Sequence, residues 1–149
     1  MLYTTRRLFL AGLLALIFAA TLHPAGAGSM PERPGDMVIG SADAPVTMIE
    51  YYSLNCPHCA VFHKQMFPAL KAQFIDTGQV RFVIRDFPLN WAAVEAAILT
   101  HCAEPERFLA VQDALFANPR LWSGAESTLL AIAEIGESGG ITRAGFKSC

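Results

Sequence analysis

Apolar residues along the first half of the chain predict a strand, a helix and a second strand. Residues 46–52 are almost wholly apolar, which is typical of a buried strand covered on both faces. A helical repeat extends from about residue 56 to residue 76, and Gly78 ends it. Residues 80–85 form the second apolar run. A strand, a crossover helix and a second strand make a right-handed βαβ unit, so the two strands are expected to be parallel.

The expected helix has one apolar stripe and one interruption. Cys59, Phe62, Met66 and Leu70 recur at helical spacing, which places Cys59 on the buried side. Pro68 lies inside the pattern and removes one backbone hydrogen bond, so a kink is expected there.

From residue 88 onwards the pattern is helical. Asn90 is suited to cap a helix that carries Trp91, Val94, Ile98 and Cys102 on one face. Further helices are expected from 105 to about 118 and from about 124 to 135, and residue 142 caps a last short one. The large aromatic residues expected in the core or in a groove wall, rather than around a cofactor, are Trp91, Phe108, Phe116 and Trp122.

The N-terminal residues have the pattern of an export signal. Arg6 and Arg7 precede an apolar segment over residues 8–22, and the small residues 25–27 follow it. The apolar segment is about 15 residues long, short of the ~20 that span a bilayer. Both the twin-arginine and the general secretory route are open, and the alternative is an uncleaved membrane anchor. A mobile arm (28–35), a short strand (37–40) and a turn (41–45) are expected next.

Composition narrows the possible partners. The 149-residue chain has 11 basic and 13 acidic residues. The predicted leader contains two of the basic residues and no acidic residue. The remainder is therefore acidic, and its basic residues are scattered singly, which makes nucleic acid an unlikely partner. An exported chain with 4 cysteines resides in an oxidising compartment.

The chemistry of the chain is centred on Cys56-Pro57-His58-Cys59. At the start of a helix, positions i and i+3 share a face, so the two cysteines can close a small ring. Unpaired N–H groups and the helix macrodipole favour a thiolate at Cys56. Pro57 fits the first helical position, and a cationic His58 would lower the cysteine pKa further.

Redox chemistry is the favoured interpretation of this pair, with two alternatives. Cys56 would be the attacking thiolate and Cys59 the buried thiol that resolves a mixed disulfide. A structural disulfide is disfavoured because so small a ring constrains little chain entropy. A copper site built from the two cysteines and His58 or His63 is the other alternative, although a histidine on a helix face, such as His63, is ordinarily solvated.

Glu50 is the one charged residue in the first apolar run. If it is buried beneath the active site, it could accept or relay the proton of Cys59. If it lies at a sheet edge, its carboxylate simply faces water.

Cys102 and Cys149 lie on apolar helix faces. A structural disulfide between them is preferred in an exported protein and would contribute about 3–4 kcal/mol. Two buried free thiols, or an intermolecular bond through the terminal Cys149, are the alternatives.

Residues 46–89 (VTMIEYYSLNCPHCAVFHKQMFPALKAQFIDTGQVRFVIRDFPL) resemble the first half of a DsbA-type thiol:disulfide oxidoreductase of the thioredoxin-like superfamily. Pro-His is that family's usual dipeptide between the cysteines, an acidic residue matching Glu50 lies near its buried cysteine, and some members carry a second cysteine pair. The resemblance implies an α/β, thioredoxin-like fold with an inserted helical subdomain. It divides the chain into a signal peptide (1–27), an arm (28–45), a strand-helix-strand half-domain (46–88) and a helical insertion (89–149). The family's cis-Pro loop, C-terminal strand pair and closing helix are missing, so a truncated family member is expected.

The resemblance also implies a function. The expected protein is a periplasmic monomer that introduces disulfides into unfolded or reduced cysteine-containing proteins, without a bound cofactor, and that a membrane-bound, quinone-linked partner reoxidises. A disulfide reductase or isomerase of the same superfamily, or a non-enzymatic copper-binding thiol protein, is the alternative.

Overall fold

The computed structural model of the chain describes residues 30–149, of which Glu32–Cys149 form one compact unit. The predicted leader and the first residues of the predicted arm lie outside the described residues. No helix among residues 30–149 is both long enough and apolar enough to cross a bilayer.

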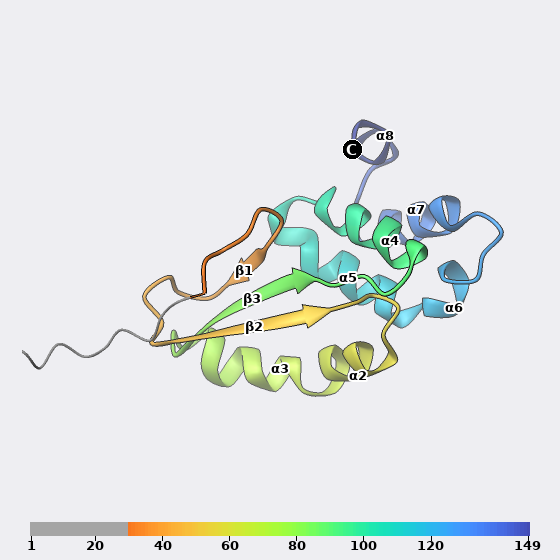
Figure 1. Cartoon of the computed structure of the whole chain (residues 1–149). Coiled ribbons are helices and arrows are strands. Elements are labelled where there is room, and N and C mark those ends of the chain that lie inside the picture. Colours follow the sequence, from red (N-terminus) through yellow and green to blue (C-terminus); the bar gives the residue numbers. More distant parts are fainter. Residues whose placement is uncertain (1–29) are drawn as a thin grey trace, which may run out of the picture. The chain divides into compact units, whose positions relative to one another are not determined.

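A three-stranded sheet forms the base of this unit (Figure 1). Its strands are β1 (Met37–Ile39), β2 (Val46–Tyr52) and β3 (Val80–Asp86), in the order β1-β3-β2. β2 and β3 are parallel, with Val46 opposite Val80 and Tyr52 opposite Asp86, whereas β1 is antiparallel to β3. The predicted parallel pair and the short first strand are therefore confirmed.

The prediction that β2 is buried on both faces is wrong. β3 is the central strand and is almost wholly buried, whereas β2 pairs on one side only within the described part of the chain. The side chains of Val46, Met48 and Tyr51 are 51%, 39% and 47% exposed. An apolar run shows that a strand can be buried, but it does not show how many neighbours the strand has.

The long helical segment after β2 is divided as predicted. It consists of α2 (Pro57–Gln65), α3 (Phe67–Leu70) and the π-helical segment η1 (Lys71–Ile75). Pro68 lies in the first turn of α3, and Gly78 follows η1 with a φ of 76° that suits glycine. Because the break at Met66 changes the phase of the helix, Met66 is 60% exposed instead of buried.

The second half of the unit is a layer of helices. Its elements are α4 (Trp91–His101), the short 3₁₀ helix η2 (Pro105–Arg107), α5 (Phe108–Ala117), α6 (Pro119–Trp122), α7 (Thr128–Ser138) and α8 (Arg143–Ser148). The caps expected at Asn90 and Thr142 are present, since Asn90 Oδ1 accepts a hydrogen bond from Ala93 N at 2.8 Å and Thr142 Oγ1 accepts one from Gly145 N at 3.0 Å.

The buried face of α4 differs from the predicted face. Trp91 and Ile98 are 74% and 54% exposed, so Trp91 does not belong to the core, and the groove wall is the remaining expectation for it. The buried side instead carries small residues and one leucine: Ala93, Ala96, Ala97 and Leu99. The helix is apolar on nearly all sides, so its sequence does not define a single stripe.

The predicted bounds of α7 are also wrong. The helix begins at Thr128 and continues through Gly136 to Ser138. A Cβ on Gly136 would lie 3.1 Å from a methyl carbon of Leu99, so this glycine allows α4 and α7 to pack closely and does not end the helix. Gly140, with a φ of 95°, lies in the turn that follows.

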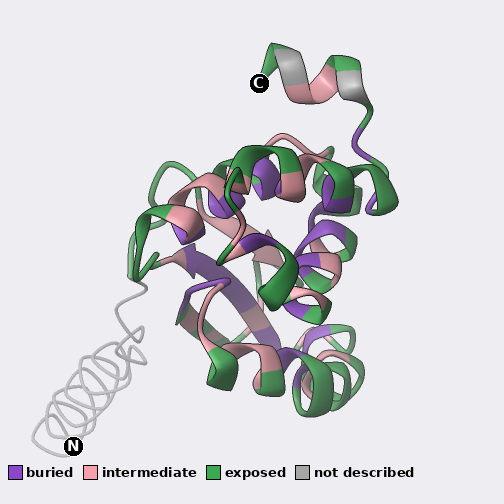
Figure 2. Cartoon of the chain, turned by 90° about the vertical axis from the view of Figure 1, so that its right-hand side faces the viewer, coloured by how far each residue is buried: buried purple, intermediate pink, exposed green. Residues whose placement is uncertain are grey.

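The core lies between the sheet and the helical layer, and Figure 2 shows the buried segments on the inner faces of both. Phe108, Phe116 and Trp122 are buried there as expected, and Trp122 Nε1 donates a hydrogen bond to the Leu115 carbonyl at 3.0 Å. A disulfide joins Cys102, at the end of α4, to Cys149, with the two Cα atoms 5.7 Å apart.

An ion pair connects the segment before β1 to the end of β3. The guanidinium of Arg85 donates to both carboxylate oxygens of Asp36 at 2.8 and 2.7 Å and to the Tyr51 hydroxyl at 2.9 Å. These hydrogen bonds outweigh the desolvation of the carboxylate, so the pKa of Asp36 is held below its usual value.

We predict that the Cys102–Cys149 disulfide stabilises the fold by restricting the unfolded chain. It closes a loop with a sequence separation of 47, for which chain entropy gives about 4 kcal/mol. The double variant Cys102→Ala, Cys149→Ala should therefore lose about 3–4 kcal/mol in urea unfolding. Ser148→Ala, on the same helix, serves as the control, and an unchanged unfolding midpoint in the double variant would contradict the prediction.

We predict that the Asp36–Arg85 ion pair makes the stability of the fold depend on pH in the acidic range. The folded-state pKa of Asp36 is lowered relative to about 3.9 in the unfolded chain, so the stabilisation is fully present above about pH 4 and is lost as pH falls through the folded-state value. Asp36→Asn should lower the melting temperature at pH 7, and its difference from the wild type should shrink below about pH 4. Asp43→Asn, in the exposed turn before β2, should behave as the wild type. A difference that does not vary with pH would exclude this origin.

Candidate functional site

The turn between β2 and α2 holds the two cysteines at the carboxyl end of the sheet. Ser53 and Leu54 are buried, and the Cys56 N–H donates to the Ser53 carbonyl at 3.0 Å. The Ser53 hydroxyl accepts hydrogen bonds from the backbone N–H groups of Asn55 and Leu89 at 3.3 and 3.4 Å. The turn is thus bonded to itself and to the β3–α4 loop, which holds Cys56 in place.

Cys56 is the N-cap residue of α2, with extended backbone angles. Its Sγ accepts a hydrogen bond from the Cys59 N–H at 3.4 Å. This is the position at which a helix presents unpaired N–H groups to an anion. Both Cys56 and Cys59 are free thiols in the structure and are partly buried.

The surroundings separate the two thiols in acidity. Burial raises the pKa of the Cys56 thiol, but hydrogen bonds from the Cys59 thiol and from the backbone N–H groups of Cys59 and His58 outweigh burial, so the pKa lies below its ordinary value. Burial raises the pKa of Cys59 to about 11, with further increases from the neighbouring Cys56 and the negative charge of Glu50. Cys56 is therefore the more acidic of the two thiols, and Cys59 keeps its proton at neutral pH.

Pro57 and His58 contribute to this geometry in different ways. Pro57 occupies the first helical position, where its missing N–H leaves no hydrogen bond unmade. His58 is exposed, and its backbone N–H, rather than a contact of its ring, is the group that acts on Cys56.

Glu50 lies on the sheet face that is covered by α2, and it is hydrogen-bonded to a histidine of that helix. His63 Nε2 is 2.9 and 3.2 Å from the two carboxylate oxygens of Glu50. The Glu50 side chain is 14% exposed, so the alternative of a carboxylate that simply faces water does not describe it. Its charge raises the pKa of both cysteines, which places it within electrostatic range of both sulfurs.

The expectation that His63 is solvated is wrong. Only 4% of the residue is exposed, and its ring stacks on Phe116 with the ring centroids 5.1 Å apart. Phe62 and Phe67 contact the ring from its own helical segment. His63 Nδ1 is buried and has no hydrogen-bond partner among residues 30–149. A histidine four residues after Cys59, together with an acidic residue in the preceding strand, is the sequence signal that could have indicated this pair.

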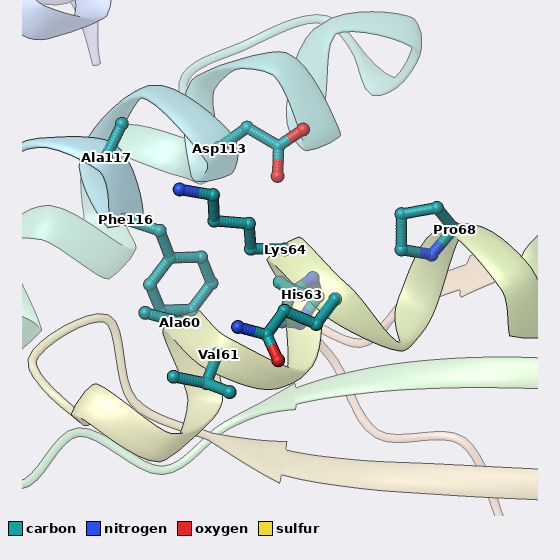
Figure 3. A pocket seen from close by; sticks show the side chains of 9 residues that line it. Ala60, Val61, His63, Lys64, Pro68, Asp113, Phe116 and Ala117 are labelled. Atoms are coloured by element: carbon teal, nitrogen blue, oxygen red, sulfur yellow. The ribbon is translucent and has the colours of Figure 1, made fainter.

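A cavity of about 540 Å³ lies between α2 and α5, with His63 in its wall. Figure 3 shows Lys64 extending from α2 towards α5, where Asp113 lies opposite. Burial raises the pKa of Asp113, and the positive charge of His63 opposes this shift.

A copper site does not assemble from the candidate ligands. No group of three or more His, Cys, Asp or Glu side chains converges among residues 30–149. His63 contacts Glu50 instead of completing a site with the two cysteines, and the sulfurs of Cys102 and Cys149 are bonded to each other.

A group of exposed apolar residues adjoins the active-site turn and was not predicted from the sequence. Phe87, Leu89 and Trp91 are 60%, 61% and 74% exposed. The Phe87 N–H donates to the Tyr52 carbonyl at 2.7 Å, so this loop is fixed next to the residues that lead into Cys56. We refer to these three residues as the loop patch.

Comparison with known proteins gives consistent matches. The thioredoxin family model matches residues 32–149. A Rickettsia bellii protein named as a candidate protein-disulfide oxidoreductase is 34% identical over 115 residues, which cover 76% of this chain and 44% of the relative. The chain thus spans less than half the length of that relative.

Solved structures agree with the family match. The crystal structure of Wolbachia pipientis alpha-DsbA1 matches with a TM-score of 0.71 and 33% identity, over 80% of this chain and 61% of that protein. A protein-disulfide isomerase from Novosphingobium aromaticivorans shares the fold, with a TM-score of 0.64 and 22% identity, over 77% of this chain and 70% of that one. With its parallel β2–α2–β3 unit, its helical layer and its Cys-x-x-Cys pair at a helix start, the chain belongs to the thioredoxin family and is of the DsbA type.

Proposed function

We propose that the chain is an exported thiol:disulfide oxidoreductase that introduces disulfides into reduced, cysteine-containing proteins. The observation that carries the proposal is the difference between the two thiols of one helical turn: the pKa of Cys56 is lowered, and that of Cys59 is raised to about 11. With such a difference, the more acidic cysteine forms the mixed disulfide with the substrate and leaves it as a thiolate. The other cysteine resolves a mixed disulfide.

The exchange proceeds in two steps. A substrate thiolate attacks Sγ of Cys56 in the oxidised pair, the Cys56–Cys59 bond breaks, and the sulfur of Cys59 takes up a proton. A second substrate thiolate then attacks the substrate sulfur of the mixed disulfide and expels Cys56 as a thiolate. Two substrate thiols are oxidised to one disulfide, the enzyme disulfide is reduced to a thiolate and a thiol, and one proton is released to solvent.

The oxidising direction follows from the stability of the leaving group. Because hydrogen bonds at the start of α2 stabilise the Cys56 thiolate, they stabilise the reduced form of the pair relative to the disulfide. The pair therefore tends to pass its disulfide to a substrate. A membrane-bound, quinone-linked partner would regenerate it, and the protein would act as a periplasmic monomer.

The loop patch supports unfolded chains as substrates. Its three large apolar side chains lie in the loop hydrogen-bonded to the active-site turn and at the start of α4, so a bound segment would contact them while its cysteine reaches Cys56. An unfolded protein exposes apolar residues near its cysteines, whereas a folded protein buries them.

The function can be tested with a reduced peptide that contains two cysteines and an aromatic residue. The oxidised protein should convert the peptide to its disulfide form, as followed by mass spectrometry after acid quenching. Cys56→Ser should abolish transfer, and reduced Cys59→Ser should accumulate a stable mixed disulfide with an oxidised peptide, because the resolving thiol is missing. The double variant Cys102→Ala, Cys149→Ala should retain transfer at temperatures where it is folded. Failure of the wild-type protein to exchange thiols with the peptide would exclude the proposed function.

The acidity of Cys56 gives a second prediction. Thiolate absorbance of the reduced protein should rise in two steps, the first below the ordinary thiol value of about 8.5 and the second near 11. Cys56→Ser should remove the first step. In His58→Ala, the first step should still occur below about pH 8.5, since alanine retains the backbone N–H. A single step at an ordinary alkaline pH would show that the helix start does not stabilise the thiolate.

A further inference from the structure

The cavity between α2 and α5 combines apolar walls with polar groups that the proposed exchange reaction does not use. Its volume of about 540 Å³ lies within the ~300–1,000 Å³ typical of pockets that bind small organic molecules. The apolar part of its walls comes from both helices and from α3: Ala60, Val61, Pro68, Phe116 and Ala117. The polar side chains that line it include His63, Lys64 and Asp113.

The contacts of His63 determine which of its ring nitrogens is free. Its Nε2 is 2.9 and 3.2 Å from the two carboxylate oxygens of Glu50, and because a carboxylate only accepts hydrogen bonds, Nε2 carries a hydrogen. Nδ1 is buried and has no hydrogen-bond partner among residues 30–149. In the neutral imidazole this nitrogen is an acceptor. A buried acceptor on a ring that lines a cavity fits a ligand that donates a hydrogen bond.

A second acceptor lies on the opposite wall of the cavity. Asp113 comes from α5, and among residues 30–149 its carboxylate forms neither a hydrogen bond nor an ion pair. Desolvation raises the pKa of this carboxyl group, so it has lost water without gaining a cation at bonding distance. Lys64 extends from α2 towards α5 but is not ion-paired with Asp113 (Figure 3). A positively charged donor would be attracted here, whereas an anion would be repelled by Asp113.

The remaining walls favour an apolar body behind such a donor. The Phe116 ring lies in the wall next to Val61 and Ala60, and an aromatic ring also attracts an ammonium group (Figure 3). Both walls are helices whose backbone groups are bonded within the helix, so an extended polypeptide would find no backbone partners here. The occupant that fits is therefore a small molecule.

We propose that this cavity binds a small organic amine, with a primary ammonium group carried on an apolar body. The ammonium donates to the Asp113 carboxylate and to His63 Nδ1, and the body packs against Val61 and Phe116. Lys64 carries the same kind of group as the ligand, and its positive charge opposes binding. The site is separate from the thiol exchange of Cys56 and Cys59.

The test compares two probes of similar shape and opposite charge. 2-Phenylethylamine and 3-phenylpropionate are titrated into ¹⁵N-labelled protein at pH 7.5, and backbone and imidazole resonances are followed by NMR. The amine should shift the resonances of residues 60–65 and 113–117 in a saturable manner, with a dissociation constant of about 1 mM or less. It should also shift the Nδ1 resonance of His63. The carboxylate should bind at least about tenfold more weakly.

Matched variants separate the site from general attraction between an amine and an acidic protein. Asp113→Asn keeps the shape of the side chain but removes its charge, and should weaken amine binding at least about tenfold. Glu134→Gln removes an exposed carboxylate from α7 and should leave binding unchanged. Lys64→Gln should tighten binding about two- to fivefold because a repelling charge is lost. Ala117→Phe, at an exposed position, should fill the cavity and prevent binding.

Three results would overturn the proposal. The first is equal binding of the two probes, and the second is an unchanged affinity in Asp113→Asn that still melts as the wild type does. The third is a lysine-containing peptide that binds more tightly than 2-phenylethylamine, which would assign the site to a polypeptide. Disulfide transfer is measured in a separate assay, so none of these results bears on the proposed function.

Discussion

The first turn of α2 places two chemically identical thiols in different electrostatic surroundings, and the function proposed for the chain depends on this difference. Backbone N–H groups point at Cys56 because it is the N-cap residue, and they stabilise its thiolate. Cys59, three residues later, faces the interior, where burial favours the neutral thiol. The two effects thus have different origins, hydrogen bonds at the helix start for Cys56 and burial for Cys59.

That helix start is held by structure on both sides. The parallel pairing of β2 and β3 brings the turn before Cys56 next to the loop after β3, and the buried hydroxyl of Ser53 bonds to both segments. The helical layer contributes Phe116, which stacks on His63 from α5. The disulfide between Cys102 and Cys149 acts elsewhere, by joining the end of α4 to the end of the chain. The sheet therefore positions the reactive thiol, while the helices enclose its inner side.

Sequence alone predicted the features that depend on local pattern. The periodicity of apolar residues and the residue types predicted the parallel strands and the kinked helix. They also predicted that this helix starts at the cysteine pair. Tertiary contacts decided what the pattern left open. The helix breaks at Met66, so Phe67 is buried where a continuous helix would have buried Met66. α4 is apolar on nearly all sides, and only its packing against Gly136 selects the alanine-rich face. The Glu50–His63 pair joins residues 13 positions apart on different elements, so the helical and strand periodicities do not predict it.

The two cysteines also differ in the residues that surround them. Substrate would approach Cys56 from the side of the loop patch, where Phe87, Leu89 and Trp91 are exposed. Cys59 lies on the helix whose next turn carries His63, which borders the cavity between α2 and α5. A thiol whose pKa is about 11 is a poor nucleophile at neutral pH unless a base takes its proton, so burial of Cys59 creates a requirement for such a base. The same packing that makes the two cysteines unequal in acidity also encloses the Glu50–His63 hydrogen bond among aromatic side chains one turn further along α2.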